Sequence, residues 1–146
     1  MTDLKLLALD AEDLSIVSAH VQDSVFKTKD MSYKPGGGQF SLAVNRFVWE
    51  EAKRGAKSFE RCRAALVFKR VNAVRLSGVD RRRAEDVLSL LAIRFAPNGE
   101  GPDGTVELTL AGGRAVALDV ECIELQFADI GGAWETERKP DHSVSQ

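Results

Sequence analysis

The chain has 146 residues, of which 44% are apolar and 29% charged, and its formal net charge is −2. These values are typical of one globular domain with its own core. They exclude a disulfide framework, because there are two cysteines, and a membrane-spanning helix, because no apolar run approaches roughly 18 residues. An acidic residue stands near the start, where a secretory signal would be basic, so we expect a cytoplasmic protein.

The first elements are a short strand and a helix. Apolar residues alternate between Leu4 and Leu9, which predicts the strand. Asp10 then has the character of a helix N-cap, and acidic residues follow it in the first turn, where the helix dipole favours them. Apolar residues at spacings of three and four predict one buried face on a helix from about Ala11 to Ser24. That face comprises Leu14, Val17, Val21 and Val25.

A hairpin is expected next. Phe26–Lys34 has the pattern of a strand, Pro35–Gly38 is a turn, and Phe40–Val44 alternates on the return. Asn45–Arg46 interrupts the alternation, which resumes at Phe47 and Trp49, so we predict a β-bulge there. Residues 50–60 are charged and are expected to form a solvent-facing loop.

The middle of the chain predicts further strands. Cys62–Phe68 and Val71–Ser77 are two of them, and Gly78–Asp86 is a polar turn. Val87–Phe95 is apolar at most positions, which favours a central strand covered on both faces. Strands at 106–110 and 114–118 flank Gly112–Gly113, which suits a two-residue hairpin turn because glycine accepts a positive φ.

The C-terminal part is expected to contain a second helix. Asp119 would cap it and Gly131–Gly132 would end it. Its apolar face would comprise Ile123, Phe127 and Ile130, with Trp134 one turn beyond. Residues 138–146 are polar, and we expect a disordered tail after a single domain formed by residues 1–137.

Together these elements predict an α+β fold. Short connections favour a mostly antiparallel sheet, or a partly open barrel, of about seven to eight strands. One helix lies in the N-terminal half and one at the C-terminus. A sheet followed by a capping helix is also similar to the pleckstrin-homology arrangement, which is a minor alternative based on element order alone.

Charge is distributed unevenly along the chain. The segment from Arg46 to Arg94 has a net charge of +7, and the segment after it has −7. Within the basic segment, Arg61, Arg63, Arg81, Arg82 and Arg83 are the candidate binding residues for an anion or a protein partner. The alternative is that Arg81–Arg83 form a solvated turn, partly neutralised by Asp80, Glu85 and Asp86.

The sequence assigns no catalytic residue, and each of the candidate side chains has a structural explanation. Cys122 would lie in the first turn of the expected second helix, but its acidic neighbours disfavour a reactive thiolate. His20 lies at the edge of the first helix's apolar face, and no nucleophile can be assigned to it. Of the two tryptophans, Trp49 is the better candidate to line a pocket, because Trp134 fits the apolar face of the expected second helix. The few cysteines and histidines lack ligand spacing, so we expect no metal and no cofactor.

Several segments carry a family resemblance: Asn45–Glu50, Val87–Phe95, Leu118–Glu124, Ala128–Gly131 and Trp134. In these segments the chain resembles a bacterial family of small proteins called domain of unknown function 2948. The resemblance covers nearly the whole chain, and it implies no activity, ligand or site residue.

The function most consistent with these observations is a non-catalytic cytoplasmic binding or adaptor module. The partner would be an unidentified protein or an anionic ligand. The sequence indicates no membrane and disfavours nucleic acid, since no aromatic residues interleave with the basic ones. The alternative is a small enzyme whose site, using Cys122, His20 or a carboxylate, is assembled by folding.

Overall fold

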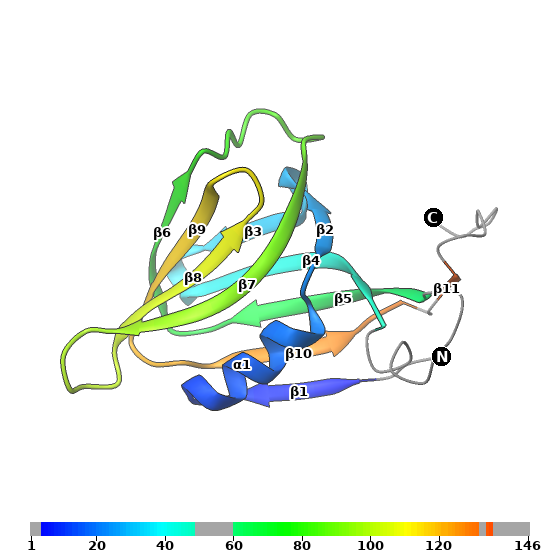
Figure 1. Ribbon diagram of the computed structural model, residues 1–146. Coiled ribbons are helices and arrows are strands. Elements are labelled where there is room, and N and C mark those ends of the chain that lie inside the picture. Colours follow the sequence, from blue (N-terminus) through cyan, green and yellow to red (C-terminus); the bar gives the residue numbers. More distant parts are fainter. Residues whose placement is uncertain (1–3, 49–59, 132–133, 136–146) are drawn as a thin grey trace.

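The computed structural model describes residues 4–48, 60–131 and 134–135. These residues form one mostly antiparallel, open sheet and one α-helix (Figure 1). The sheet has ten strands of four or more residues and a two-residue strand: β1 (Lys5–Ala8), β2 (Ser24–Lys27), β3 (Met31–Lys34), β4 (Gln39–Phe47), β5 (Glu60–Phe68), β6 (Val71–Ser77), β7 (Val87–Pro97), β8 (Gly104–Leu110), β9 (Arg114–Val120), β10 (Leu125–Asp129) and β11 (Trp134–Glu135). This exceeds the seven to eight strands expected. The mostly antiparallel sheet is confirmed.

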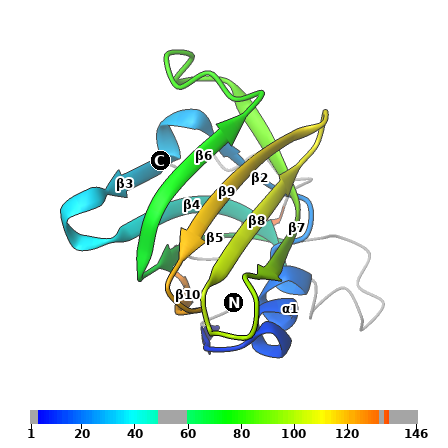
Figure 2. The same ribbon diagram turned by 90° about the vertical axis from the view of Figure 1, so that its left-hand side faces the viewer.

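The strand order is β1-β10-β5-β4-β2-β7-β8-β9-β6, with β3 paired to β4 and β11 to β5. The sheet curls around a single apolar core, so that its two halves face each other (Figures 1 and 2). The helix α1 (Ala11–His20) packs against β1 and β7. Each inward face is apolar at alternate positions because successive side chains of a strand point to opposite sides.

The N-terminal helix is confirmed, but it is shorter than expected. Asp10 is the N-cap, and its carboxylate accepts a hydrogen bond from the Asp13 N–H at 2.7 Å. The helix ends at His20 because the chain then turns through Asp23, whose φ is +63°, and enters β2. Val25 therefore belongs to a strand and not to the helix face.

Two of the expected strands differ in detail. The segment Phe26–Lys34 is divided by the short 3-10 helix η1 (Thr28–Asp30), where the Asp30 carboxylate accepts a hydrogen bond from the Lys27 N–H at 2.8 Å. A second 3-10 turn, η2 (Pro35–Gly37), joins β3 to β4. β7 is covered on one face only, because Val87 and Leu91 are exposed on the other.

The predicted bulge at Asn45–Arg46 is wrong. β4 pairs with β5 in an unbroken register from Phe40 to Phe47. Arg46 takes the inward position that follows Val44 in the alternation, and it is fully buried. The bulges lie elsewhere, between Leu90 and Ala92 of β7 and at the start of β6.

The predicted second helix is also wrong. Asp119 does not cap a helix: it lies in β9, where its carboxylate binds Arg75 and the Thr105 hydroxyl. After a turn at residues 121–124 the chain forms β10, in which Leu125, Phe127 and Asp129 face the core. Within the described ranges α1 is the single α-helix, so the basis for a pleckstrin-homology arrangement is lost. The hairpin at Gly112–Gly113 is confirmed, and both glycines have a positive φ, of 82° and 74°. Its loop is not the expected two-residue turn: Leu110 pairs with Arg114, so the loop has three residues, 111–113.

Candidate functional site

A buried ion pair joins Arg46 of β4 to Asp129 of β10. Their side chains are 0% and 1% exposed. Nε and Nη2 of Arg46 donate to the two carboxylate oxygens at 2.9 and 3.0 Å. The same carboxylate accepts a bond from the Leu4 N–H at 3.1 Å, which ties in the strand edge at β1. Such fork-to-fork pairing fixes geometry, and its burial points to a structural role.

Other candidate groups lie around this pair. The Arg46 guanidinium is 5.6 Å from the centre of the Phe127 ring, and His20 stacks on the same ring at 6.4 Å. Cys62, the residue opposite Arg46 on β5, is buried, and Cys122 is half-buried in the turn between β9 and β10. No disulfide joins these two cysteines. Neither His20 nor Cys122 lines any of the three hollows described below.

The five predicted binding residues lie in different places. Arg61 and Arg63 lie on the outer face of β5, which the alternation of that strand dictates. The Arg61 guanidinium lies 4.0 Å from the centre of the Phe47 ring, and partial burial lowers the pKa of Arg61. The Arg63 guanidinium donates to Asn45 Oδ1 at 3.2 Å and to Asp30 Oδ1 at 3.3 Å.

The three consecutive arginines lie in the turn between β6 and β7, and two of them are paired. Arg82 binds the Asp80 carboxylate at 3.1 and 3.2 Å, and these hydrogen bonds lower the pKa of Asp80. Arg83 binds Asp86 at 3.0 Å. Arg81 instead lines an apolar hollow between β3 and β6. Arg82 and Arg83 are thus exposed and paired with neighbouring carboxylates, as in the solvated turn that the sequence offered as the alternative to a binding site.

A basic hollow forms where β2, η1, β4 and β5 meet. Its volume is about 280 Å³, and it combines cationic, polar and apolar side chains. We call it the Arg63 hollow; it is lined by Val25, Phe26, Lys27, Lys29, Asp30, Asn45, Arg63 and Val87. Backbone bonds from Thr28 N–H to Asp86 and from Lys29 N–H to Ala84 bring the β6–β7 turn beside it.

Sequence reasoning missed Lys27 and Lys29. They belong to residues 1–45, which have a net charge of −2, so the net charge of that segment gives no sign of a basic site. Their separation by two residues would place them on one side only in an extended segment, where alternate residues point the same way; Lys29 instead lies in η1. The register of β2 and β4 brings Lys27 to the side of the sheet that carries Arg63. Lys29 follows in η1 and lines the same hollow.

The two lysines share one carboxylate. The amino groups of Lys27 and Lys29 lie 2.8 and 2.7 Å from the oxygens of Glu85. These contacts lower the pKa of Glu85 to about 2, and the same pairing raises the pKa of Lys29. All three side chains are at least 45% exposed, so solvent screens the pairing. The lysines are thus placed to hold a carboxylate that approaches from solvent.

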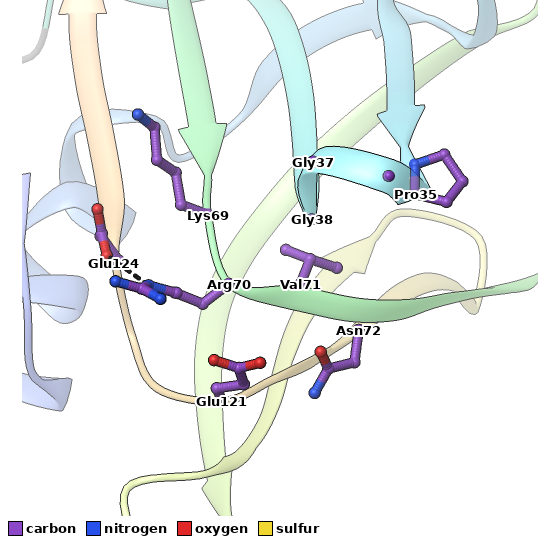
Figure 3. Close-up of a pocket in the computed structure, with 10 residues that line it drawn as sticks. Pro35, Gly37, Gly38, Lys69, Arg70, Val71, Asn72, Glu121 and Glu124 are labelled. Carbon is purple, nitrogen blue, oxygen red and sulfur yellow. Dashed lines mark hydrogen bonds and ion pairs between the residues drawn. The ribbon is translucent and has the colours of Figure 1, made fainter.

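A second hollow, of about 600 Å³, lies where three turns meet (Figure 3). The first turn is η2 with Gly38. Lys69 and Arg70 come from the β5–β6 turn, and Glu121 and Glu124 come from the β9–β10 turn. Arg70 Nε lies 3.4 Å from Glu124 Oε1. Its two cations and two carboxylates balance, so the hollow has no net preference for either sign of charge.

Other site classes find no support in the described part of the chain. No three His, Cys, Asp or Glu side chains among these residues gather in a way that could hold a metal ion. None of the helices there has the length and apolar character that a membrane crossing requires. Trp49, the 50–60 loop apart from Glu60, and the predicted tail lie outside the described residues.

These features define a small α+β protein with a curled antiparallel sheet and a basic hollow on its outer face. Comparison with protein families gives a match over residues 4–142 to the family described as protein of unknown function DUF2948. The chain belongs to this family, as its sequence motifs indicated. Comparisons with curated proteins and with solved structures gave no match.

Proposed function

We propose that this protein is a non-catalytic binding module that recognises an acidic segment of a partner protein through the Arg63 hollow. One observation carries the proposal: three cationic side chains from three separate elements converge on a single hollow. Lys27 comes from β2, Lys29 from η1 and Arg63 from β5. Basic side chains that merely keep a surface soluble need no such convergence.

The immobilisation of Arg63 supports the proposal. Asn45 and Asp30 each accept one hydrogen bond from its guanidinium, which fixes the side chain without using all of its donors. An arginine held in this way loses little conformational freedom on binding a carboxylate. Exposed Val87 and half-buried Val25 provide apolar surface beside it for the rest of a peptide.

The contact with Glu85 supports an acidic ligand in particular. An exposed carboxylate of the chain already lies between Lys27 and Lys29 at hydrogen-bond distance. A carboxylate from a partner would make the same contacts in exchange, so the lysines can change partner at small energetic cost. We also propose that the module acts in the bacterial cytoplasm, in keeping with two cysteines that are not joined by a disulfide.

The test measures binding of a fluorescently labelled, glutamate-rich peptide by anisotropy, with a matched glutamine peptide and inorganic phosphate as comparisons. We expect the glutamate peptide to bind and its affinity to fall as salt rises, since exposed charges are screened over about 8 Å at physiological ionic strength. Arg63→Gln should weaken binding about fivefold, the equivalent of about 1 kcal/mol.

Arg75→Gln is the matched control, because Arg75 is an exposed arginine of β6 paired with Asp119, away from the hollow. Equal losses for Arg63→Gln and Arg75→Gln would show that net charge alone attracts the peptide. Binding of the glutamine peptide with the same affinity would contradict the proposal. Competition by phosphate at the same concentrations would assign the hollow to a free anion.

A second candidate function is a small enzyme that uses the hollow of Figure 3. Glu121 and Glu124 line it together, and a carboxylate pair can serve as acid and base. A panel of chromogenic ester, phosphate and glycoside substrates tests this candidate. Turnover that disappears in Glu121→Gln while the fold remains intact would replace the binding module by an enzyme.

A further inference from the structure

Two strand edges face a common apolar slot. Among the described residues β6 ends the sheet and pairs with β9 alone, and β3 pairs with β4 alone. Figure 2 shows β6 at the edge of the sheet with β3 beyond it. Between them lies a hollow of about 250 Å³. We call it the β3–β6 slot; it is lined by Met31, Tyr33, Phe40, Val74, Leu76 and Arg81.

The hydrophobic core reaches the surface in this slot. Phe40 is a core residue and packs against Phe68, with ring centres 6.2 Å apart. Met31, Tyr33, Val74 and Leu76 are only partly buried against that core. Val74 and Leu76 are alternate residues of β6, so their apolar side chains lie on the same face of that strand.

The two ends of the slot differ. At one end the Val71 N–H donates to Gly38 O at 2.9 Å, which ties the start of β6 to the residue after η2. A Cβ at Gly38 would lie 3.2 Å from Val71 O, so this close contact favours glycine. At the other end lies Arg81, which makes no hydrogen bond or ion pair with any residue the structure describes, whereas Arg82 and Arg83 each hold a carboxylate.

We propose that the β3–β6 slot accepts an extended peptide of a partner protein, which adds a strand along β6 and presents a carboxylate to Arg81. The edge of β6 that no described strand covers supplies backbone donors and acceptors, and strands pair at about 4.8 Å. Alternate apolar side chains of the peptide would contact Val74 and Leu76. The charge of Arg81, which pairs with no described residue, selects a peptide with an acidic residue at that end.

This inference does not depend on the Arg63 hollow. The slot uses backbone hydrogen bonding, apolar contact and one cation, Arg81, whereas the hollow relies on three other cationic side chains. A peptide in the slot should therefore keep most of its affinity in Arg63→Gln. Failure of one proposal leaves the other open to its own test.

The experiment selects binders of the full chain from a random peptide library displayed on phage. We expect enriched peptides to alternate apolar and polar residues and to carry an acidic residue. A synthetic representative should protect β6 amides from hydrogen exchange, and N-methylation at alternate positions of its backbone should abolish binding, because it removes the ladder donors. Arg81→Ser should weaken binding about three- to tenfold.

Arg82→Ser is the matched control, since Arg82 lies beside Arg81 but is paired with Asp80; this variant should bind normally. The absence of any enriched peptide would overturn the proposal. So would enriched peptides that leave β6 exchange unchanged or tolerate N-methylation throughout. Protection of β6 that rises with protein concentration in the absence of peptide would assign the slot to a second copy of the chain and would also overturn it.

Discussion

Two arginines on neighbouring strands, Arg46 of β4 and Arg63 of β5, have opposite environments although each is paired with an aspartate. The Arg46–Asp129 side chains are 0% and 1% exposed, and their contacts are short on both oxygens. The Arg63–Asp30 side chains are 37% and 18% exposed, with a contact of 3.3 Å. The face of the strand decides the outcome: the inward pair holds strands together, and the outward pair leaves an arginine accessible to a ligand.

The largest effect is expected from breaking the inward pair. Asp129→Ala leaves the buried Arg46 charge without its carboxylate, which should lower the free energy of unfolding by about 3–5 kcal/mol. Urea unfolding followed by circular dichroism measures it. The double variant Arg46→Met with Asp129→Leu should recover much of the loss, because both members of the buried pair are then apolar. A loss below about 1 kcal/mol for Asp129→Ala would show that the pair is dispensable.

A comparable loss is expected at Phe127, which is 1% exposed in β10. Phe127→Ala should cost about 3–5 kcal/mol, as large-to-small core substitutions do. Ile130→Ala is the matched control: Ile130 is 58% exposed, so the change should stay within about 0.5 kcal/mol. Equal losses at both positions would favour the helical face that the sequence suggested over the observed strand.

The strands of the sheet differ in how far the sequence could predict them. Alternating strands such as β4, β5, β8 and β9 were predictable, because the period of two is explicit in them. β10 was not, because Asp129 places a charge at an inward position and the spacing of Phe127, Ile130 and Trp134 imitates a helix. Arg46 similarly imitated a break in β4. Each charge is tolerated in the core because it is paired with the other. The two residues are 83 positions apart in the sequence, so no local pattern reveals the pairing.

The Arg63 hollow was predictable in part. Arg63 was identified as a candidate because it lies in the basic segment. Lys27 and Lys29 were not, since they come from a net acidic segment and approach Arg63 only through the pairing of β2 with β4 and of β4 with β5. Strand order is a property of the whole sheet, so residues brought together across it cannot be grouped from the sequence.

A smaller effect concerns pH and the pairing of Glu85. Lys27 and Lys29 lower the pKa of Glu85 from 4.5 to about 2, so its contribution to stability is complete above about pH 4.5 and is lost as pH falls toward 2. Glu85→Gln should therefore reduce the slope of unfolding free energy against pH within that window and leave the slope above pH 5 unchanged. Urea unfolding across a pH series provides the measurement. An unchanged slope below pH 4.5 would show that the pairing does not persist in solution.

The most direct test of the outward arginine as a binding residue compares two variants with opposite expected effects. Isothermal titration calorimetry with the glutamate-rich peptide measures the affinity of Arg63→Gln and of Glu85→Gln beside the unmodified chain. Arg63→Gln removes a cation from the hollow and should weaken binding. Glu85→Gln removes the carboxylate that competes for Lys27 and Lys29 and should strengthen it. Opposite shifts of about three- to fivefold are predicted; an unchanged affinity in both variants would contradict the assignment of the Arg63 hollow as the binding site.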